Sequence, residues 1–596
     1  MLRFVLCFTI LMGQSGDLLA HKELDWWQTS LIYQIYPMSY KDSDGDGYGD
    51  INGIYEKLDY IQDLGVDAIW VQPFYKSPMK DNGYDVADYT GVNPLLGTLD
   101  DVKKLISATH DRGMKFLMDF VPNHSSDECE WFKLSLKRVE PFTNFYIWKD
   151  GVRINATHTT YPNNWASRFT GSAWTWREER KQYYLHQFAT NQPDLNFRDP
   201  KTRQTVESAV RFWLDLGCDG FRLDAPKHVF EDSQFKDEPQ IHDYRTVPNE
   251  WFALDHIYTM ALPESYGLVR DWALFLMIKK RDGRTRILMT EDYDSPAVLI
   301  KYLENATSPG AQIPLYLTMT EMSSTTNASR LDWWVHSMSD VFPKGYFNWA
   351  LDNHDNHRVP TRFTPESVDA MNMLTLLLPG VATMYYGTEL GMPDIKVRPD
   401  QRQDKQPGAG ATGDDNDSRD ASRNPMIWDD SDNAGFTTAK KPWLPVTPSY
   451  YHINVKTQQR DPQSHLNIYK RLVKLRKTHI IQHGDFETFV HSEWVYIFTR
   501  SLDNEQIAVI LNLGSESEEV CAKGSAFALP DTMFVHTSSV NSGFSFGNKV
   551  KISAEDGTPC LKLRPYAGIV LTTNHSVAVS CSLFVLLLTL CSNLLL

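Results

Sequence analysis

The chain repeats one pattern: an amphipathic helix, a glycine that ends it, and a short apolar strand. In the clearest copy, apolar residues recur at helical spacing between Thr202 and Leu216, Gly217 ends the helix, and a strand starts at Gly220. The same order precedes the apolar segments 66–71 and 115–120. Parallel strands that alternate with such helices favour an α/β fold built on an eight-stranded (β/α)8 barrel. A doubly wound sheet is the alternative, although its phosphate-binding glycine fingerprint is missing after the first strand.

Three further stretches depart from this pattern. Residues 125–192 are rich in Trp, Tyr, Asn and Thr without helical periodicity, which predicts a small domain inserted after the third strand of a barrel made by residues 21–124 and 193–480. Residues 394–433, rich in Asp, Gly, Arg and Asn, read as a long functional loop within the barrel. Alternation of apolar and polar residues from 481 to 573 predicts a C-terminal antiparallel β-sandwich domain.

Both ends of the chain resemble processing signals. Residues 1–20 place a basic residue before a short apolar run, which is typical of a cleavable signal peptide. Residues 574–596 combine small residues, a short spacer and a terminal apolar run, and no Lys or Arg follows, so this segment resembles a GPI-anchor attachment signal. A membrane-spanning helix is the alternative. We expect an extracellular protein that is tethered to the cell membrane.

Composition agrees with this placement. A net charge of −16 without a basic run argues against nucleic acid as a partner. Outside the two terminal segments the cysteines are Cys129, Cys218, Cys521 and Cys560, too few for a disulfide scaffold. The last two lie in one predicted domain and are able to pair, whereas Cys218 lies in a predicted core strand. N-glycosylation is predicted at the sequons of Asn155, Asn305, Asn327 and Asn416.

Polar residues follow several of the predicted strands directly. Each of them alone fits a structural role, and Arg222 with Asp224 fits a buried ion pair. Together, at the carboxyl ends of the strands of one barrel, their side chains are expected to converge on one cleft. The residues concerned are Tyr84, Asp85, His124, Arg222, Asp224, Glu291, His354 and Asp355.

The order of these motifs resembles the signature regions of the α-amylase superfamily, glycoside hydrolase family 13. The resemblance covers nearly the whole mature chain, from Trp27 to Leu571, and insect midgut α-glucosidases, or maltases, are the nearest group in overall character. The segment 192–196, Gln-Pro-Asp-Leu-Asn, resembles the oligo-1,6-glucosidase and α-glucosidase branch. The other motifs are Asp119-Phe-Val-Pro-Asn-His124, Gly220-Phe-Arg-Leu-Asp224, Thr290-Glu291 and Asn353-His354-Asp355.

This resemblance implies a retaining, exo-acting α-glucosidase. Asp224 would be the nucleophile, Glu291 the general acid and then base, and Asp355 the carboxylate that stabilises the transition state. Arg423 would grip the terminal glucose beside Asp85, with Arg419 as the alternative. The other residues expected to bind substrate are Tyr84, His124, Arg222 and His354.

Three positions next to these motifs bear on specificity. Asp292 follows the acid where the resembling family commonly has Ala-Tyr, and Lys227 stands in an unusual Pro-Lys-His segment. Ala225 follows the nucleophile, and alanine there accompanies α-1,4 preference in the resembling branch. The expected substrates are therefore maltose, sucrose and short malto-oligosaccharides.

A glycine-rich acidic loop follows the first predicted strand. Carboxylates are ligands that Ca²⁺ prefers, so we expect a structural calcium ion there. The loop is not an EF-hand, because its twelfth position is Gly53, and a solvated acidic turn is the alternative reading. The expected ligands are Asp42, Asp44, Asp46, Tyr48 and Asp50.

Other roles are compatible with the same resemblance. Amino-acid transporter heavy chains also resemble α-glucosidases, but they carry an internal spanning helix where this chain has a cleavable signal. Some anchored insect relatives bind a bacterial binary toxin, so a receptor role beside catalysis is an added hypothesis. A homodimer is a further one.

Overall fold

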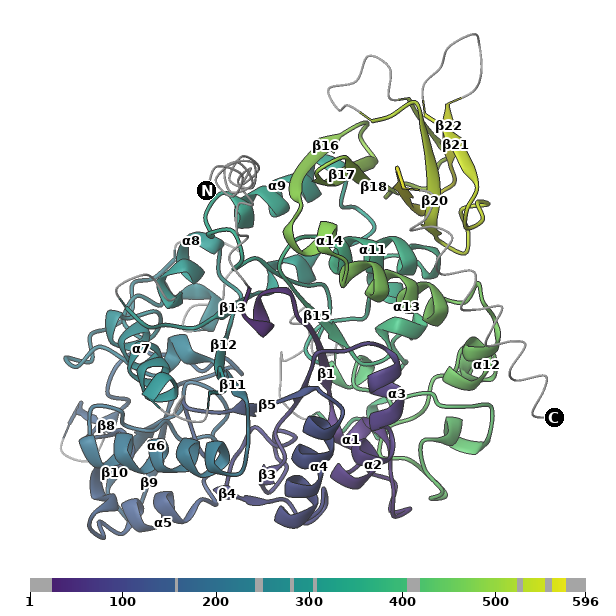
Figure 1. The fold of residues 1–596 in the computed structure, drawn as a ribbon. Coiled ribbons are helices and arrows are strands. Elements are labelled where there is room, and N and C mark those ends of the chain that lie inside the picture. The colour runs from purple at the N-terminus through teal and green to yellow at the C-terminus, as the bar shows by residue number, and fades with distance from the viewer. Residues whose placement is uncertain are drawn as a thin grey trace, which may run out of the picture.

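The computed structural model describes residues 24–155, 159–241, 250–278, 283–303, 308–404, 418–521, 529–552 and 560–574 (Figure 1). The expected signal peptide, the GPI signal after residue 574 and the sequons at Asn305 and Asn416 lie outside these ranges. Within them, none of the helices has both the length and the apolar character that crossing a membrane requires.

Eight parallel strands form a barrel at the centre of the molecule (Figure 1). They occupy the sheet in the order β13-β12-β11-β5-β2-β1-β15-β14, so neighbours in the chain are neighbours in the sheet. This confirms the predicted (β/α)8 barrel. The strands are β1 (Leu31–Ile35), β2 (Ala68–Val71), β5 (Lys115–Phe120), β11 (Gly220–Leu223), β12 (Ile287–Asp292), β13 (Ile313–Tyr316), β14 (Asn348–Ala350) and β15 (Val381–Tyr385).

The first and last strands in this order are joined through one side chain. The Asn348 amide oxygen accepts the Tyr316 backbone N–H at 2.7 Å, and its nitrogen donates to the Pro314 carbonyl at 2.8 Å. Asn348 is buried, so these bonds satisfy backbone groups that would otherwise be orphaned between β13 and β14.

Alternation along the strands separates two apolar layers. Ile32, Trp70 and Leu117 point into the barrel and form an interior cluster. Tyr33, Ile69 and their equivalents point outward and pack against the helices. Polar residues interrupt the interior layer near the carboxyl ends of several strands, as at Asp119 and Arg222. The functional groups therefore sit on a packed apolar floor.

Several of the helices begin at side-chain caps, among them α4 and α6. Asp199 accepts the Thr202 N–H and Pro200 occupies the first turn, so α6 starts two residues before the predicted Thr202. Thr98 and Asp101 form a capping box at the start of α4. The helices are α1 (Pro37–Tyr40), α2 (Ile51–Glu56), α3 (Leu58–Asp63), α4 (Leu99–Asp111), α5 (Glu130–Leu136), α6 (Pro200–Asp215), α7 (Pro263–Ile278), α8 (Pro296–Leu299), α9 (Ala328–Ser339), α10 (Val359–Arg362), α11 (Val368–Leu377), α12 (Val455–Arg460), α13 (His465–Arg476) and α14 (His479–His483).

Short strands between β5 and α6 form the inserted unit, which has a small core of its own. The Trp165 and Trp174 rings stack with centroids 5.9 Å apart, and both side chains are buried. Its strands are β6 (Trp148–Lys149), β7 (Val152–Arg153), β8 (Thr159–Thr160), β9 (Trp174–Arg177) and β10 (Gln182–Leu185). The remaining hairpin, β3 (Tyr75–Lys76) with β4 (Asp88–Val92), precedes α4.

The C-terminal strands form an antiparallel sheet in the order β16-β17-β18-β23-β20-β21, beside a smaller pair, β19 with β22. Val509 on one face joins the barrel core, while Ile510 on the other face belongs to a separate cluster. This confirms the predicted sandwich. The strands are β16 (Asp485–Val490), β17 (Val495–Leu502), β18 (Glu505–Asn512), β19 (Glu518–Val520), β20 (Thr532–Ser538), β21 (Lys549–Lys551), β22 (Leu561–Leu563) and β23 (Gly568–Thr572).

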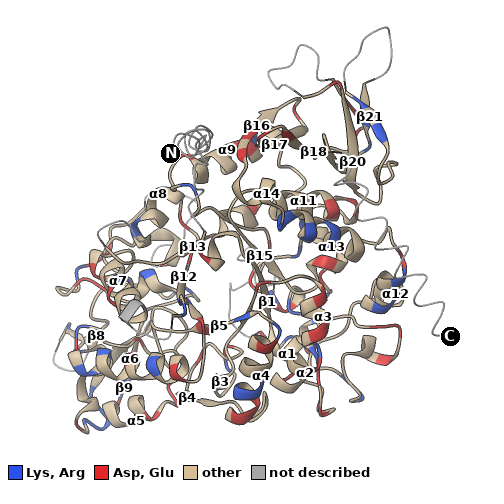
Figure 2. Ribbon diagram, in the orientation of Figure 1, with Lys and Arg blue, Asp and Glu red and all other residues tan. Residues whose placement is uncertain are grey.

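The cysteines agree with the sequence analysis. Cys521 and Cys560 form a disulfide that joins the segments after β19 and before β22, as predicted. Cys218 is buried and free, as is Cys129. Lys and Arg are interspersed with Asp and Glu over the molecule (Figure 2).

Candidate active site

A buried guanidinium, that of Arg222, organises the carboxyl end of the barrel. Its Nη1 donates to Asp119 Oδ1 at 2.7 Å and to Asp224 Oδ1 at 2.6 Å. Its Nη2 lies 2.8 Å from Glu291 Oε1. The three carboxylates come from β5, the end of β11 and β12, and β11 lies between the other two strands. A cation on the middle strand therefore reaches all three.

Burial and charge give Asp224 and Glu291 different proton affinities. Burial raises the pKa of Asp224 to about 6, against the opposing effect of Arg222. Burial raises the pKa of Glu291 further, to about 8, and the negative charge of Asp224 adds to this rise. Because both carboxyls bind terminal nitrogens of the Arg222 guanidinium, they lie close together. At neutral pH the pair holds a carboxylate beside a carboxylic acid.

The backbone after Asp224 is strained. Ala225 has φ 45° and ψ 44°, a left-handed conformation that residues other than glycine seldom adopt. In this conformation its N–H donates to Glu291 Oε2 at 3.0 Å. The left-handed conformation of Ala225 therefore directs its backbone N–H toward the Glu291 carboxyl.

Asp355 lies among groups that keep it ionised. Burial alone would raise the pKa of Asp355, but the positive charges of Arg419 and Arg423 outweigh it and hold the pKa well below the ordinary value. Arg423 Nη2 donates to Asp355 Oδ1 at 2.8 Å, and Arg419 Nη1 lies 3.4 Å from the same oxygen. His354 Nε2 is 3.2 Å from Asp355 Oδ2.

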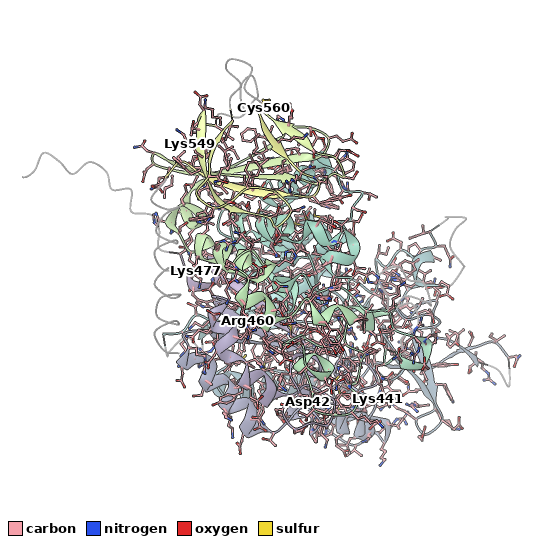
Figure 3. The ribbon with its side chains drawn as sticks, turned by 90° about the vertical axis from the view of Figure 1, so that its right-hand side faces the viewer. Asp42, Lys441, Arg460, Lys477, Lys549 and Cys560 are labelled. Atoms are coloured by element: carbon pink, nitrogen blue, oxygen red, sulfur yellow. A yellow bond between two sulfur atoms is a disulfide. The ribbon has the colours of Figure 1, made fainter. Side chains whose placement is uncertain are left out.

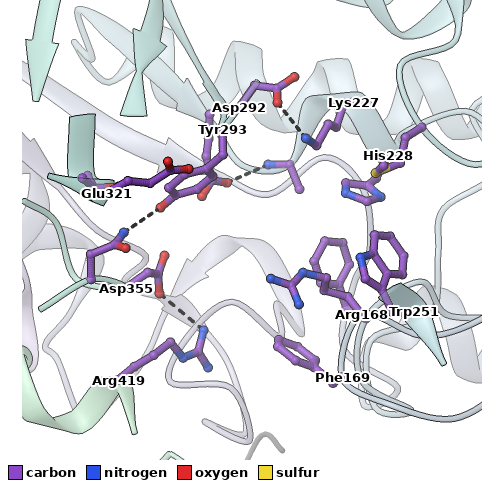
Figure 4. Close-up of a pocket in the computed structure, with 16 residues that line it drawn as sticks. Arg168, Phe169, Lys227, His228, Trp251, Asp292, Tyr293, Glu321, Asp355 and Arg419 are labelled. Atoms are coloured by element: carbon purple, nitrogen blue, oxygen red, sulfur yellow. Dashed lines mark hydrogen bonds and ion pairs between the residues drawn. The ribbon is translucent and has the colours of Figure 1, made fainter. Parts of the chain in front are cut away.

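Two connected cavities meet at these groups. The inner one, about 90 Å³, is bordered by Asp224, Glu291 and Asp355, together with Asp81, Tyr84, His124, Phe169, Phe188, Gln192, Ala225, His354 and Arg419. The outer one, about 490 Å³, shares Glu291, Ala225 and Asp355 with it and opens toward Lys227, Trp251 and Glu321 (Figure 4). Because Asp224 borders only the inner cavity, a ligand must pass Glu291 to reach it.

The histidines and Tyr84 of the inner cavity are as the motifs predict. Tyr84 Oη is 2.9 Å from His354 Nε2, and the two rings stack. His124 Nε2 is 3.1 Å from the side-chain nitrogen of Gln192, and burial lowers the pKa of His124 to about 3. Both histidines are therefore neutral at physiological pH.

Asp85 and Arg423 differ from the sequence-based expectation. The Asp85 carboxylate anchors its own loop, where it accepts from Ser77 Oγ and from the backbone N–H groups of Lys80 and Asp81. Arg423 is fully buried behind Asp355, where its Nε donates to the His354 carbonyl. Neither residue borders the cavities.

The ion pair at the inner end is made by Asp81 and Arg419. Arg419 Nη2 donates to Asp81 Oδ1 at 2.8 Å, and its Nε donates to Asp404 Oδ2 at 2.7 Å. Arg419 was the alternative that the sequence left open. Asp81 was missed, although it lies four residues before Asp85 in the same loop, because loop residues carry no periodicity that tells which side chain faces the cavity.

Lys227 and Asp292, which depart from the resembling family, pair with each other. Lys227 Nζ lies 2.7 Å from Asp292 Oδ1 and 3.2 Å from Asp294 Oδ2. Asp292 is fully buried and also accepts from Tyr302 Oη. The charge beside Glu291 is thus compensated within the wall of the outer cavity (Figure 4).

The acidic loop brings three carboxylates together. One oxygen from each of Asp42, Asp44 and Asp50 lies within 4.8 Å of the others. Asp42 accepts the backbone N–H groups of Asp44, Gly45 and Gly47, which hold the loop in a tight curve. Asp46 is outside this group and accepts the Tyr48 N–H instead. The donor set is hard oxygen, which suits Ca²⁺.

The loop is tied to the barrel by stacked rings. Tyr48 stacks on Trp443 with centroids 6.1 Å apart, and Trp443 stacks on Tyr36 at 6.0 Å. The Arg423 guanidinium lies over the Tyr36 ring at 5.5 Å. Trp443 also donates its backbone N–H to the Gly47 carbonyl, and Asp42 lies close to this segment near Lys441 (Figure 3). The acidic loop and the Arg423–Asp355 pair thus share one packed column.

Comparison with known proteins agrees with this geometry. The alpha amylase catalytic domain matches residues 34–484. The chain belongs to the alpha-amylase family. It is 40% identical to Maltase 1 of Drosophila virilis over 556 residues, which is 92% of this chain and 87% of that protein. It is also 40% identical to the Alpha-glucosidase of Apis mellifera over 532 residues, which is 88% of this chain and 92% of the relative.

Other members of the alpha-amylase family are similar over the same span. The crystal structure of the alpha-glucosyl transfer enzyme XgtA matches with a TM-score of 0.78 and 32% identity, over 93% of this chain and all of that one. The Amino acid transporter heavy chain SLC3A1 of Rattus norvegicus is 37% identical over 84% of this chain and 72% of its own length. The catalytic domain and the relatives named maltase and alpha-glucosidase identify the chain as a glycoside hydrolase.

The Arg222 cluster predicts a large stability change. Arg222→Met leaves Asp119, Asp224 and Glu291 buried without their cation, so we expect the free energy of unfolding to fall by about 3–5 kcal/mol at pH 7.5. The difference in free energy of unfolding between wild type and Arg222→Met becomes smaller as the pH falls, because protonation removes the uncompensated charges. Differential scanning calorimetry measures both effects. Arg211→Met, an exposed arginine on α6, is the matched control and leaves Tm unchanged; equal Tm values for the two variants would contradict the role of Arg222.

Proposed function

We propose that this protein is a retaining, exo-acting α-glucosidase that releases terminal α-1,4-linked glucose from maltose, sucrose and short malto-oligosaccharides. One observation carries the proposal: Asp224 and Glu291 contact the same guanidinium and both border the inner cavity. Similarity to proteins named maltase and alpha-glucosidase supports it.

The proton affinities suit the two roles. Asp224, with a pKa of about 6, is ionised at neutral pH and attacks the anomeric carbon. Glu291, with a pKa of about 8, donates its proton to the departing oxygen. The glucosyl ester formed on Asp224 is then cleaved by water, and Glu291, now a carboxylate, takes the proton of that water.

The short separation of the Asp224 and Glu291 carboxyls supports retention of the anomeric configuration. Retaining glycosidases hold their carboxyl groups roughly 5 Å apart, whereas inverting enzymes separate them by roughly 6.5–9.5 Å to admit a water molecule. The binding of Asp224 and Glu291 to one guanidinium supports the shorter, retaining separation. Asp355, which stays ionised, faces the same cavity and is placed to stabilise the positive charge that develops on the sugar.

The Asp81–Arg419 ion pair supports exo action. It lines the inner cavity together with Asp224, where it would limit access to the terminal residue of a chain. Ala225, whose small side chain borders both cavities, supports the preference for α-1,4 links. The ratio of kcat/KM for maltose and isomaltose measures this preference, and a ratio below one would contradict it.

We also propose that the loop 42–50 binds a structural Ca²⁺ through Asp42, Asp44 and Asp50, with the Tyr48 carbonyl as a further ligand. The three clustered carboxylates support this assignment. Bound calcium would neutralise their mutual repulsion and fix the loop on which Tyr48 and Trp443 stack. The Cys521–Cys560 disulfide supports an extracellular location, since such bonds persist in oxidising compartments.

Loss of the nucleophile tests the enzyme assignment. We expect wild type to hydrolyse maltose and Asp224→Asn to be inactive although it still folds cooperatively. Asp503→Asn, an exposed turn residue, is the matched control and keeps full activity. Proton NMR during wild-type turnover should show α-glucose before mutarotation. Activity in Asp224→Asn would contradict the nucleophile, initial β-glucose would contradict retention, and inactive wild type would favour a non-enzymatic role like that of the heavy chain.

The pKa values predict a bell-shaped pH profile. As the pH rises through about 6, Asp224 loses its proton and kcat/KM increases; through about 8, Glu291 loses its proton and kcat/KM decreases. Steady-state rates from pH 4.5 to 9.5 measure both limbs. Glu291→Gln, assayed with an activated aryl α-glucoside, should lose the alkaline limb. An alkaline limb that survives in this variant would contradict the assignment of the acid.

Metal removal is expected to lower the stability of the fold, because the ion takes no part in the catalytic chemistry. EDTA should lower Tm and Ca²⁺ should restore it, since a ligand present at 100 times its Kd contributes about 2.7 kcal/mol. Asp44→Asn should abolish this response, whereas Asp46→Asn, whose carboxylate lies outside the cluster, should keep it. A Tm that EDTA leaves unchanged in wild type would overturn the calcium site and favour the acidic-turn reading.

A further inference from the structure

Arg168 extends from the inserted unit into the outer cavity. It lies between β8 and β9, is half-buried, and borders the outer cavity but not the inner one. Its backbone N–H donates to the Gln187 carbonyl at 2.8 Å, which fixes the base of the side chain. Its guanidinium points into the cavity, across from Asp355 and Glu321 (Figure 4). The side chain is thus held where a bound molecule would meet it.

The other cations of this cavity are compensated. Lys227 is paired with Asp292 and Asp294. Arg419 is paired with Asp81, Asp404 and Asp355. The positive charges of Lys227 and Arg419 are therefore neutralised by carboxylates of the protein itself.

Arg168 has no such partner. In the part of the chain that the structure describes, its guanidinium makes no hydrogen bond and no ion pair, and only ring faces lie against it: Trp251 at 6.0 Å and Phe252 at 5.4 Å. Partial burial lowers the pKa of Arg168, which shows that the charge has lost solvation. A half-buried cation without a counter-charge is costly, and a ligand that supplies acceptor oxygens would remove the cost.

The position of Arg168 identifies which part of a ligand it meets. Asp224 borders only the inner cavity, Glu291 borders both, and Arg168 borders only the outer one. With a glucose at Asp224, the group that departs past Glu291 occupies the outer cavity. Arg168 therefore faces the leaving group and not the glucose.

We propose that Arg168 is a specificity-determining residue that binds acceptor oxygens of the leaving group and makes α-glucosides with a carboxylate-bearing leaving group preferred substrates. This inference rests on the proposed α-glucosidase function. The planar guanidinium, braced by the rings of Trp251 and Phe252, presents a fork of N–H donors that matches a carboxylate bidentately. Hydrogen bonds from the same N–H donors to neutral hydroxyls stabilise the complex less.

Three substrates isolate this contact. Maltobionate and maltitol carry the same α-1,4-linked glucose on an open six-carbon leaving group that ends in a carboxylate or in a hydroxymethyl group. α-Glucosyl fluoride has a leaving group too small to reach Arg168. The kcat/KM of each is measured for wild type, Arg168→Met, which keeps the length without the charge, and Arg168→Lys, at low and high NaCl.

We expect wild type to favour maltobionate over maltitol about tenfold, as a charge-assisted hydrogen bond allows. Arg168→Met should lose this preference, Arg168→Lys should retain part of it, salt should reduce it, and turnover of the fluoride should be unchanged in both variants. A ratio near one in wild type, or an unchanged ratio in Arg168→Met, would overturn the proposal while turnover of the fluoride leaves the glucosidase function intact. No turnover of the fluoride by wild type would overturn both.

Discussion

The contact between Arg222 and three carboxylates is the interaction on which the site depends. Parallel pairing places Arg222 level with Asp119 on the neighbouring strand, and β12 on the other side delivers Glu291. The cation lies over the Trp70 ring at 5.3 Å, at the top of the apolar interior. Without that cation, the barrel would have to keep several acids neutral in one small space. With it, the acids keep separate proton affinities.

Neighbouring charges, rather than depth, decide the proton affinity of each acid. Burial raises the pKa of Asp224, Glu291 and Asp355 alike. Only at Asp355 do two arginines outweigh burial, so this group stays ionised while Glu291 keeps its proton. Arg423, one of the two, is backed by Tyr36 and so by the stacked column that ends at the acidic loop. Residues remote from the cavities thus contribute to its electrostatics.

Sequence reasoning succeeded where regular structure constrains the chain. The helix–glycine–strand pattern predicts the barrel, and the spacing of Arg222 and Asp224 on one strand puts both side chains on the same face. It failed inside loops. Asp81 and Asp85 share one irregular segment, and only tertiary contacts turn Asp81 toward Arg419 and Asp85 toward its own backbone. For the same reason no pattern pointed to Arg168, which lies in a loop of the inserted unit and meets the cavity through packing alone.

The side-chain amide of Asn348 joins β13 and β14, the two end strands of the sheet order. Between β13 and β14 the Asn348 side chain makes the hydrogen bonds that a backbone ladder makes between the other neighbouring strands, so the ladder is interrupted along this line. Glu291 and Asp355 lie on opposite sides of this line, the first on β12 and the second just after β14. A sugar that contacts both residues would connect the two sides of the barrel at this junction.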